Sequence, residues 1–230
     1  MKYLLDTNVL SELFKKKPET KVAKWLAEAD QELAKIPADA FDDFIVNNRL
    51  NQFLYERKFK EATDFMQRRI QALPANEPAD AWVRLFMVQA AFCHEWLGQK
   101  EEARQLFERV VQETKPTPDT IVKPEANGLP STLALAYAGL GEKEKALQQA
   151  SQAVKDYETD AVNKPAAEIV LAQIQARFGQ TDAAITALPY LLQVPAGLTV
   201  ANLNYDPMWD PIREDPRFQK LLSKPAPGSK

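Results

Sequence analysis

A pattern of one glycine, one alanine and one apolar residue recurs along this chain and limits its fold more than any other feature. The glycine stands five residues before the alanine, and the apolar residue follows the alanine by four. Three copies carry the whole pattern: Gly98, Ala103 and Phe107; Gly141, Ala146 and Ala150; Gly179, Ala184 and Leu188. A weaker fourth copy, residues 57–66, has Ala62 and Met66 without the glycine. A repeated unit of this kind predicts a repeat architecture.

The spacing predicts a helix, a turn and a second helix in every unit. Glycine adopts a positive φ without steric cost, so the glycines mark places where one helix ends and the next begins. Each alanine is expected at the closest approach of the paired helices, with the following apolar residue one turn later on the same face. Helical patterns precede each turn at Phe44–Tyr55, Ala81–Trp96, Ser131–Ala138 and Ala166–Arg177.

These units resemble the tetratricopeptide repeat. The family's small residue in the second helix matches the four alanines, its aromatic near the end of the first helix matches Phe53 and Tyr137, and its closing proline matches Pro74. The alanines lie 41, 43 and 38 residues apart, whereas the family period is about 34, which indicates longer linkers. The resemblance implies an all-α solenoid of helix-turn-helix pairs. The alternative is a generic helical bundle.

Three Asp-Pro pairs follow the last repeat, at Asp206-Pro207, Asp210-Pro211 and Asp215-Pro216. Each aspartate is expected to cap a short helix that has proline in its first turn. The segment resembles the end of tetratricopeptide modules that follow winged-helix, kinase or cyclase domains in bacterial signalling proteins. Because a terminal repeat would otherwise expose its core, we expect residues 198–224 to form a C-terminal cap.

Residues 1–28 have a different character. An apolar stretch, Tyr3-Leu4-Leu5, ends at Asp6-Thr7-Asn8, and a helical pattern follows around Trp25. This resembles the start of PIN-domain toxin ribonucleases, in which the residue matching Asp6 is a metal ligand and the residue matching Asn8 supports the site. A lone carboxylate does not make such a site, since Mg²⁺ there needs several oxygen ligands. The resemblance leaves a metal-dependent ribonuclease as the alternative function, although its site is incomplete. A gene fusion or a misassigned start could explain the junction between this segment and the repeats.

The composition favours a soluble protein without nucleic-acid or zinc chemistry. The net charge is −3 with 27% charged residues, and there is one cysteine and one histidine. Cys93 and His94 are adjacent on a predicted helix, so their side chains diverge, and no second pair completes a zinc site. The single cysteine excludes an internal disulfide and suits a reducing compartment, so we expect a cytoplasmic protein. No apolar run has the roughly 18 residues of a membrane helix, and no cofactor is expected.

The first helices of stacked pairs line a concave groove in repeat proteins. The family register places Asn47, Asn48 and Asn51 there, followed by Gln89, Phe92 and Leu135, although Phe92 and Leu135 could equally belong to the core. A groove of amide and apolar side chains suits an extended or helical peptide. It lacks the basic cluster of a carboxylate clamp.

The sequence therefore predicts a noncatalytic protein-interaction or scaffold module, or a regulatory fragment of a larger signalling protein. Its expected organisation is a PIN-like segment at 1–28, a linker at 29–38, repeats at 39–197, a cap at 198–224 and a tail at 225–230. The partner is expected to be a protein or peptide, with no membrane and no nucleic acid.

Overall fold

The computed structural model describes residues 43–71, 80–114 and 131–222, together with five isolated helical positions at Thr20, Lys21, Lys24, Glu28 and Gln31. All regular structure within these residues is helical. The segment that matches the start of a PIN domain, including Asp6 and Asn8, lies outside the described residues except for four of those helical positions. The predicted domain boundaries remain predictions.

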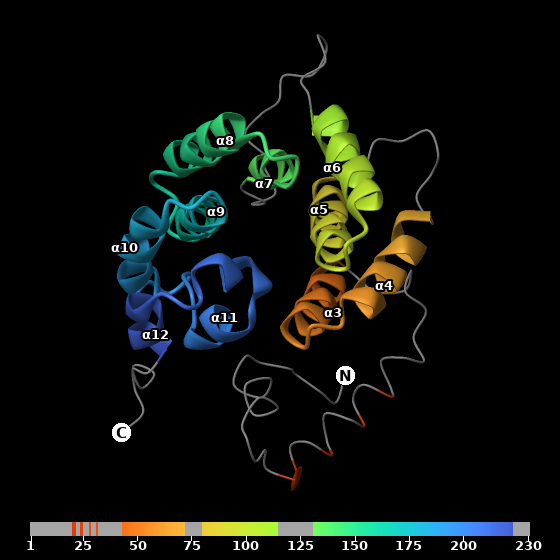
Figure 1. Cartoon of the computed structure of the whole chain (residues 1–230), viewed down its shortest axis with the longest axis horizontal. Coiled ribbons are helices and arrows are strands. Elements are labelled where there is room, and N and C mark those ends of the chain that lie inside the picture. The colour runs from red at the N-terminus through yellow and green to blue at the C-terminus, as the bar shows by residue number, and fades with distance from the viewer. Residues whose placement is uncertain are drawn as a thin grey trace.

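Four consecutive helix pairs form the body of the protein (Figure 1). They are α3 (Asp43–Tyr55) with α4 (Phe59–Gln71), α5 (Ala81–Trp96) with α6 (Lys100–Thr114), α7 (Thr132–Gly139) with α8 (Lys143–Asp156), and α9 (Asn163–Arg177) with α10 (Thr181–Leu191). Each helix packs on the next along the chain, and α3, α5, α7 and α9 also contact one another in order. The predicted all-α, tetratricopeptide-like solenoid is confirmed.

The turn inside each pair depends on one residue with a left-handed backbone. Gly98, Gly141 and Gly179 have φ values of 77°, 77° and 74°, as the glycine pattern predicted. Arg57 occupies the same place in the first pair and has a φ of 58°. A left-handed conformation costs a residue with a Cβ about 1–2 kcal/mol, because the Cβ approaches the following carbonyl oxygen. The first turn therefore contains a strained arginine where the other three contain glycine.

The repeat alanines lie in the core, as predicted. Ala62, Ala146 and Ala184 are fully buried, and Ala103 is nearly so. The apolar residue one turn later is also buried in every pair. These small side chains let the two helices of a pair approach closely, which a longer side chain would prevent.

Three short helices follow the fourth pair: α11 (Val200–Tyr205), the 3₁₀ helix η2 (Pro207–Ile212) and α12 (Pro216–Leu222). Two of the predicted Asp-Pro caps are confirmed, because Asp206 accepts from the Met208 amide and Asp215 from the Arg217 amide. The third predicted cap, at Asp210-Pro211, is wrong. Pro211 lies inside η2, and the Asp210 carboxylate binds Arg57 and Arg213 instead of capping a helix.

The core has three apolar clusters along the chain. The first joins α3, α4 and α5, the second joins α5 to α8 with part of α9, and the third joins α9 and α10 with the cap. Trp209 and Phe218 are fully buried in the third cluster, as predicted for a cap, and Met208 packs against the second. The cap is thus anchored on α9 and α10 and reaches the middle repeats.

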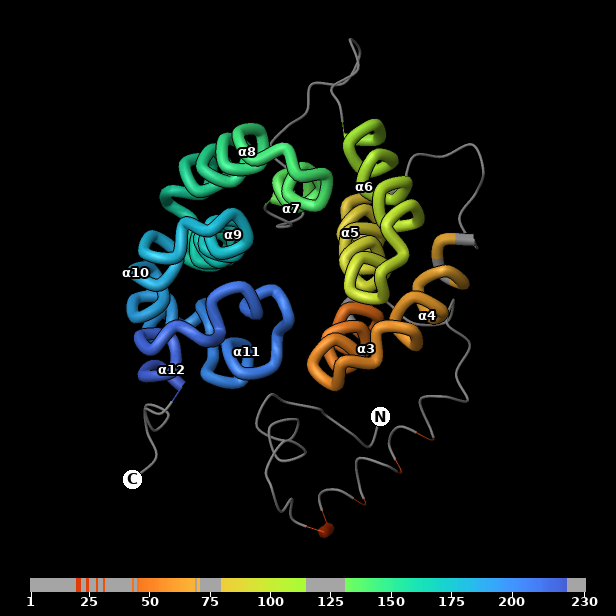
Figure 2. Tube along the Cα trace, in the orientation of Figure 1, coloured from red at the N-terminus to blue at the C-terminus, as the bar shows by residue number. Residues whose placement is uncertain are grey.

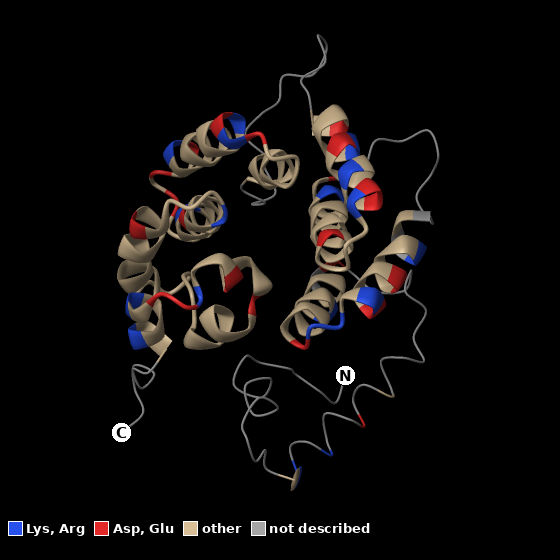
Figure 3. Ribbon diagram, viewed as in Figure 1, with Lys and Arg blue, Asp and Glu red and all other residues tan. Residues whose placement is uncertain are grey.

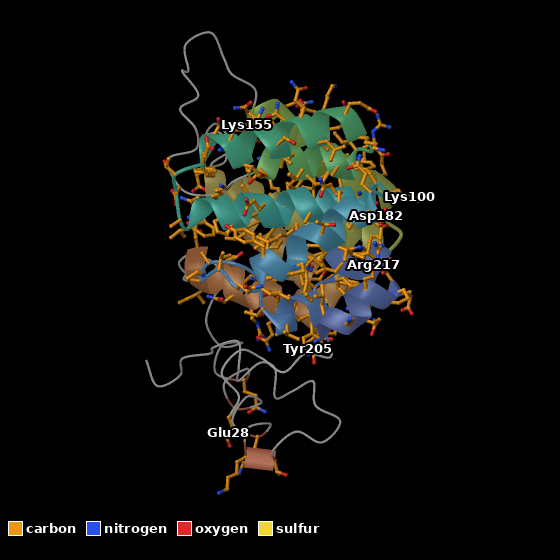
Figure 4. All side chains as sticks on the ribbon, turned by 90° about the vertical axis from the view of Figure 1, so that its left-hand side faces the viewer. Glu28, Lys100, Lys155, Asp182, Tyr205 and Arg217 are labelled. Carbon is orange, nitrogen blue, oxygen red and sulfur yellow. The ribbon has the colours of Figure 1, made fainter. Side chains whose placement is uncertain are left out.

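The helix pairs follow a curved path that brings the two ends of the array together (Figures 1 and 2). The helices α3, α5, α7 and α9 form the inner row, while α4, α6, α8 and α10 form the outer row. The helix α11 faces α3 across the curve (Figure 1). Charged side chains follow the outer helices, whereas α7 carries none (Figure 3). Within the cap, η2 packs on α9, and α12 packs on α10, where Arg217 pairs with Asp182 (Figure 4).

Neighbouring alanines in α10 provide a test of the packing. Ala184→Leu should destabilise the fold by roughly 1–3 kcal/mol, since the added atoms enter a filled core. Ala183 is exposed on the same helix, so Ala183→Leu should change the stability by no more than about 0.5 kcal/mol. Urea denaturation followed by far-UV circular dichroism measures both. Equal stability of the two variants would show that Ala184 does not lie at a close helix contact.

Candidate functional site: the inner face and the seam that closes it

Side chains from the first repeat and from the cap meet in a polar seam. The Arg57 guanidinium donates two hydrogen bonds to Asp210, with Nη1 2.5 Å from Oδ2 and Nη2 2.8 Å from Oδ1. The Asn202 amide donates to the Tyr55 hydroxyl at 2.5 Å. Tyr55 ends α3 and Arg57 lies in the turn after it, whereas Asn202 and Asp210 belong to the cap. We use the name seam for these four residues, which join segments about 150 positions apart.

The seam has little apolar support. The apolar cluster of the first repeat and that of the cap have no described residue in common. Among described elements, α3 and α4 are absent from the helix pairs that pack extensively on α11 or η2. The Arg57 and Asp210 side chains are 42% and 41% exposed, so water and salt weaken their attraction. Such pairs contribute on the order of 1 kcal/mol or less.

A buried carboxylate lies directly behind the seam. Asp206 links α11 to η2, accepts from the Met208 amide at 2.9 Å and accepts from Gln173 Nε2 of α9 at 3.0 Å. Burial raises the pKa of Asp206 to about 6, and repulsion by Asp210 adds to that effect. The Met208 amide and the positive charges of Arg213 and Arg57 act in the opposite direction. The packing of the cap on α9 therefore keeps an acid in an environment that disfavours its charge.

Arg213 holds the cap segment together beneath the seam. Its guanidinium donates to the carbonyl oxygens of Leu203 and Asn204 in the last turn of α11 and to that of Asp206 just after the helix. It also donates to Asp210 at 2.9 Å. Burial alone would raise the pKa of Asp210, but the hydrogen bonds from Arg57 and Arg213 outweigh it and hold that pKa below its usual value. Asp210 is therefore presented to Arg57 as an anion.

The asparagines predicted for the groove lie on the side of α3 that faces the cap. Asn51 precedes Tyr55 by one helical turn and Asn48 by two, so all three share one face of the helix. Asn51 and Asn47 are half-buried, and Asn48 is exposed. Because Tyr55 contacts Asn202, the cap approaches the face that was predicted to bind a partner.

The other predicted groove residues have different surroundings. Phe92 and Leu135 are buried in the second cluster, and Phe92 contacts the rings of Trp96 and Phe107. The sequence left open whether these two side chains line the groove or belong to the core, and the structure places both in the core. Gln89 is half-buried, and its Oε1 is a buried acceptor with no hydrogen-bond donor among the described residues.

A second polar contact ties the middle repeats at the ends of their inner helices. Arg177, at the end of α9, donates to both carboxylate oxygens of Glu95 in α5, at 2.8 and 2.9 Å. It also donates to the Ala138 carbonyl of α7 and lies 5.4 Å from the Phe92 ring centre. Beside this contact, α6 and the turn between α7 and α8 enclose a cleft of about 760 Å³ whose rim carries three acidic and three basic side chains.

The sequence did not predict the seam. The local signal for it was the arginine at position 57, where the other repeats have glycine. A residue with a Cβ in a left-handed turn is strained, and such strain is retained where the side chain has a structural or functional role. The pairing of Arg57 with Asp210 depends on the curvature of the whole array, which local patterns do not contain. Cys93, by contrast, is a buried core thiol, and burial raises its pKa to about 12.

The described residues contain neither a group of metal ligands nor a membrane-spanning helix. Asp6 lies outside the described residues. Within the described part of the chain, no three His, Cys, Asp or Glu side chains are grouped as ligands for a metal ion. None of the described helices is long and apolar enough to span a membrane.

The tetratricopeptide repeat family matches residues 86–113, which cover most of α5 and α6. The matched segment contains Gln89, Phe92 and the Gly98 turn. No curated protein and no solved structure matches this chain.

The buried carboxylate gives the fold a specific pH dependence. The pKa of Asp206 is about 6 in the folded protein and 3.8 for the free side chain. Its folded state therefore binds the proton more tightly, and its contribution to stability is full below pH 4 and is lost as the pH rises through 6. Relative to Asp206→Asn, the parent should lose on the order of 2–3 kcal/mol between pH 4 and pH 7.

Urea denaturation at both pH values measures this difference. Asp156→Asn is the matched control, since Asp156 is exposed on α8 and accepts one hydrogen bond from Gln152. A stability difference between the parent and Asp206→Asn that is the same at pH 4 and pH 7 would contradict the assignment.

Proposed function

We propose that this chain is a noncatalytic protein-interaction module whose inner face binds an extended or helical segment of a partner protein. The observation that carries the proposal is the tetratricopeptide match over α5 and α6, which stand among neighbouring pairs with the same turn and the same buried alanine. Repeats of that family commonly bind protein segments along their inner helices, and stacked pairs form the extended concave surfaces that such binding needs.

The chemistry of the inner face supports a peptide as the ligand. Asn47, Asn51 and Gln89 offer amide groups that both donate and accept, which complements the backbone of a peptide. The Gln89 Oε1 is a buried acceptor without a described donor, and such a group costs about 1–3 kcal/mol when it remains unpaired. Rotation of this half-buried side chain toward a bound segment would let a backbone N–H satisfy it.

The finer features of the proposal follow from the sequence. Residues 39–197 would form the binding body and residues 198–224 its cap, as in the bacterial signalling modules that the cap resembles. The single buried thiol suits a reducing compartment, such as the cytoplasm. The partner, on this proposal, is another protein of the same compartment.

Selection from a random peptide library displayed on phage provides the test. Peptides that bind the purified protein should lose affinity for Asn51→Ala and for Gln89→Ala by roughly fivefold or more each, the effect expected for one lost hydrogen bond. Isothermal titration calorimetry with synthetic peptides measures that loss. Gln148→Ala is the matched control, because Gln148 is exposed on the outer helix α8 and its truncation should leave the affinity unchanged.

Selected peptides that bind both inner-face variants as tightly as the parent would contradict this location. A library that yields no binding peptide under any condition would contradict the function itself.

A further inference from the structure

Arg57 has a left-handed backbone conformation, which is unfavourable for a residue with a Cβ. The three equivalent turns contain Gly98, Gly141 and Gly179, each with nothing within 4 Å of the position that a Cβ would occupy. A glycine at position 57 would adopt the observed φ of 58° without strain. Backbone strain of this kind persists where surrounding structure or function requires the side chain. Among the described residues, the Arg57 side chain donates two hydrogen bonds to Asp210 of the cap and is also attracted by Asp206.

The partner of Arg57 belongs to a firmly anchored cap. Trp209, Ile212 and Phe218 fix η2 and α12 in the apolar cluster of α9 and α10. Gln173 of α9 donates to Asp206, and Met208 packs against the middle cluster. The cap therefore stays on the last repeats when its contacts with the first repeat break.

The boundary between the cap and the first repeat is weak by comparison. Its hydrogen bonds between described residues are those from Arg57 to Asp210, which are partly exposed, and the one from Asn202 to Tyr55. The first cluster and the cap cluster share no described residue. Separation of α3 from the cap breaks these few hydrogen bonds.

We propose that the seam is an autoinhibitory latch that holds the array closed over the face of α3 that contains Asn48 and Asn51. With the latch formed, the cap lies against the end of this face, and a peptide reaches it only after the first repeat separates from the cap. The proposal rests on the proposed function, because it regulates access to the same inner face. A peptide that binds the open array also favours opening, since it shifts the equilibrium by its differential affinity for the two states.

The variant Arg57→Gly tests the latch contact independently of the stability of the fold. The substitution gives the first turn the residue of the other three, so it relieves the strain and leaves the thermal unfolding midpoint equal or higher. It also removes both hydrogen bonds to Asp210. A residue that served only the fold would lower the midpoint when replaced. Asp210→Asn tests the same contact from the cap, and Arg57→Lys should retain part of the closure.

Access to the inner face is measured as the rate at which a bulky maleimide modifies Asn51→Cys, in the absence of any peptide. The native Cys93 is buried and its thiol pKa is raised, so it contributes little to the signal. Arg57→Gly and Asp210→Asn should each accelerate modification by up to roughly fivefold, the change in the open population expected for about 1 kcal/mol. Arg104→Gly removes an exposed arginine that pairs with Glu108 on α6 and should not change the rate.

Salt gives a second measurement that needs no change in the seam. In Asn51→Cys alone, modification should be faster in 1 M than in 0.05 M sodium chloride, because screening weakens a partly exposed ion pair. A reporter cysteine at exposed Glu144 on α8 corrects for the effect of salt on the reagent.

The outcomes distinguish the latch from the function that it regulates. Faster modification in both seam variants and in high salt, with an unchanged or raised unfolding midpoint for Arg57→Gly, supports the latch even if no peptide is found. Equal modification rates in the parent, in both seam variants and in high salt overturn it, even if peptides bind the inner face. A lowered midpoint for Arg57→Gly would also overturn it, because the arginine would then serve the fold.

Discussion

Each pair of helices in this chain is joined by a residue with a left-handed backbone, and the rest of the structure depends on that turn. The turn reverses the chain within a few residues, so the buried alanine of the second helix meets the first helix at close range. Three glycines adopt this conformation freely. Arg57 adopts it at a cost, and it is the turn residue whose side chain reaches the opposite end of the array. The constraint that shapes every repeat therefore also places the guanidinium at the seam.

The cap is attached to the array in two ways of unequal strength. On α9 and α10 it buries Trp209 and Phe218, and truncation of such side chains to alanine costs about 3–5 kcal/mol each. On the first repeat it makes the partly exposed ion pair of Arg57 and Asp210, which contributes on the order of 1 kcal/mol or less. It also makes one hydrogen bond to Tyr55, which contributes about 1 kcal/mol. Because the weaker attachment breaks first, the array opens between α3 and the cap, and the cap itself stays folded on α9 and α10.

The sequence predicted the helix pairs well, because their signals are local. Glycine at a turn, alanine one and a half turns later and an apolar residue beyond it are all fixed by the geometry of two adjacent helices. The caps at Asp206 and Asp215 were also predicted, since each involves only the two residues that follow. Asp210 has the same sequence context, yet it binds Arg57, because its position in space is set by the curvature of four repeats.

The inner face was predicted only in part for the same reason. A repeat register identifies which side of a helix faces inward, and the structure places Asn48, Asn51 and Tyr55 on one side of α3. The register does not reveal how far the neighbouring helices bury that side, and Phe92 and Leu135 lie in the core. Nor does it show that the cap of the same chain lies against the end of the inner face.

The two ends of the array meet in solution, and a measured distance between the first repeat and the cap tests this most directly. Spin labels at Glu61→Cys on α4 and Glu214→Cys in the cap lie at exposed positions outside the seam contacts. Pulsed electron paramagnetic resonance at low salt should give one narrow distance distribution, because the closed array fixes both labels relative to each other. A broad distribution that extends to longer distances under those conditions would show that the first repeat and the cap are apart, and would contradict the account.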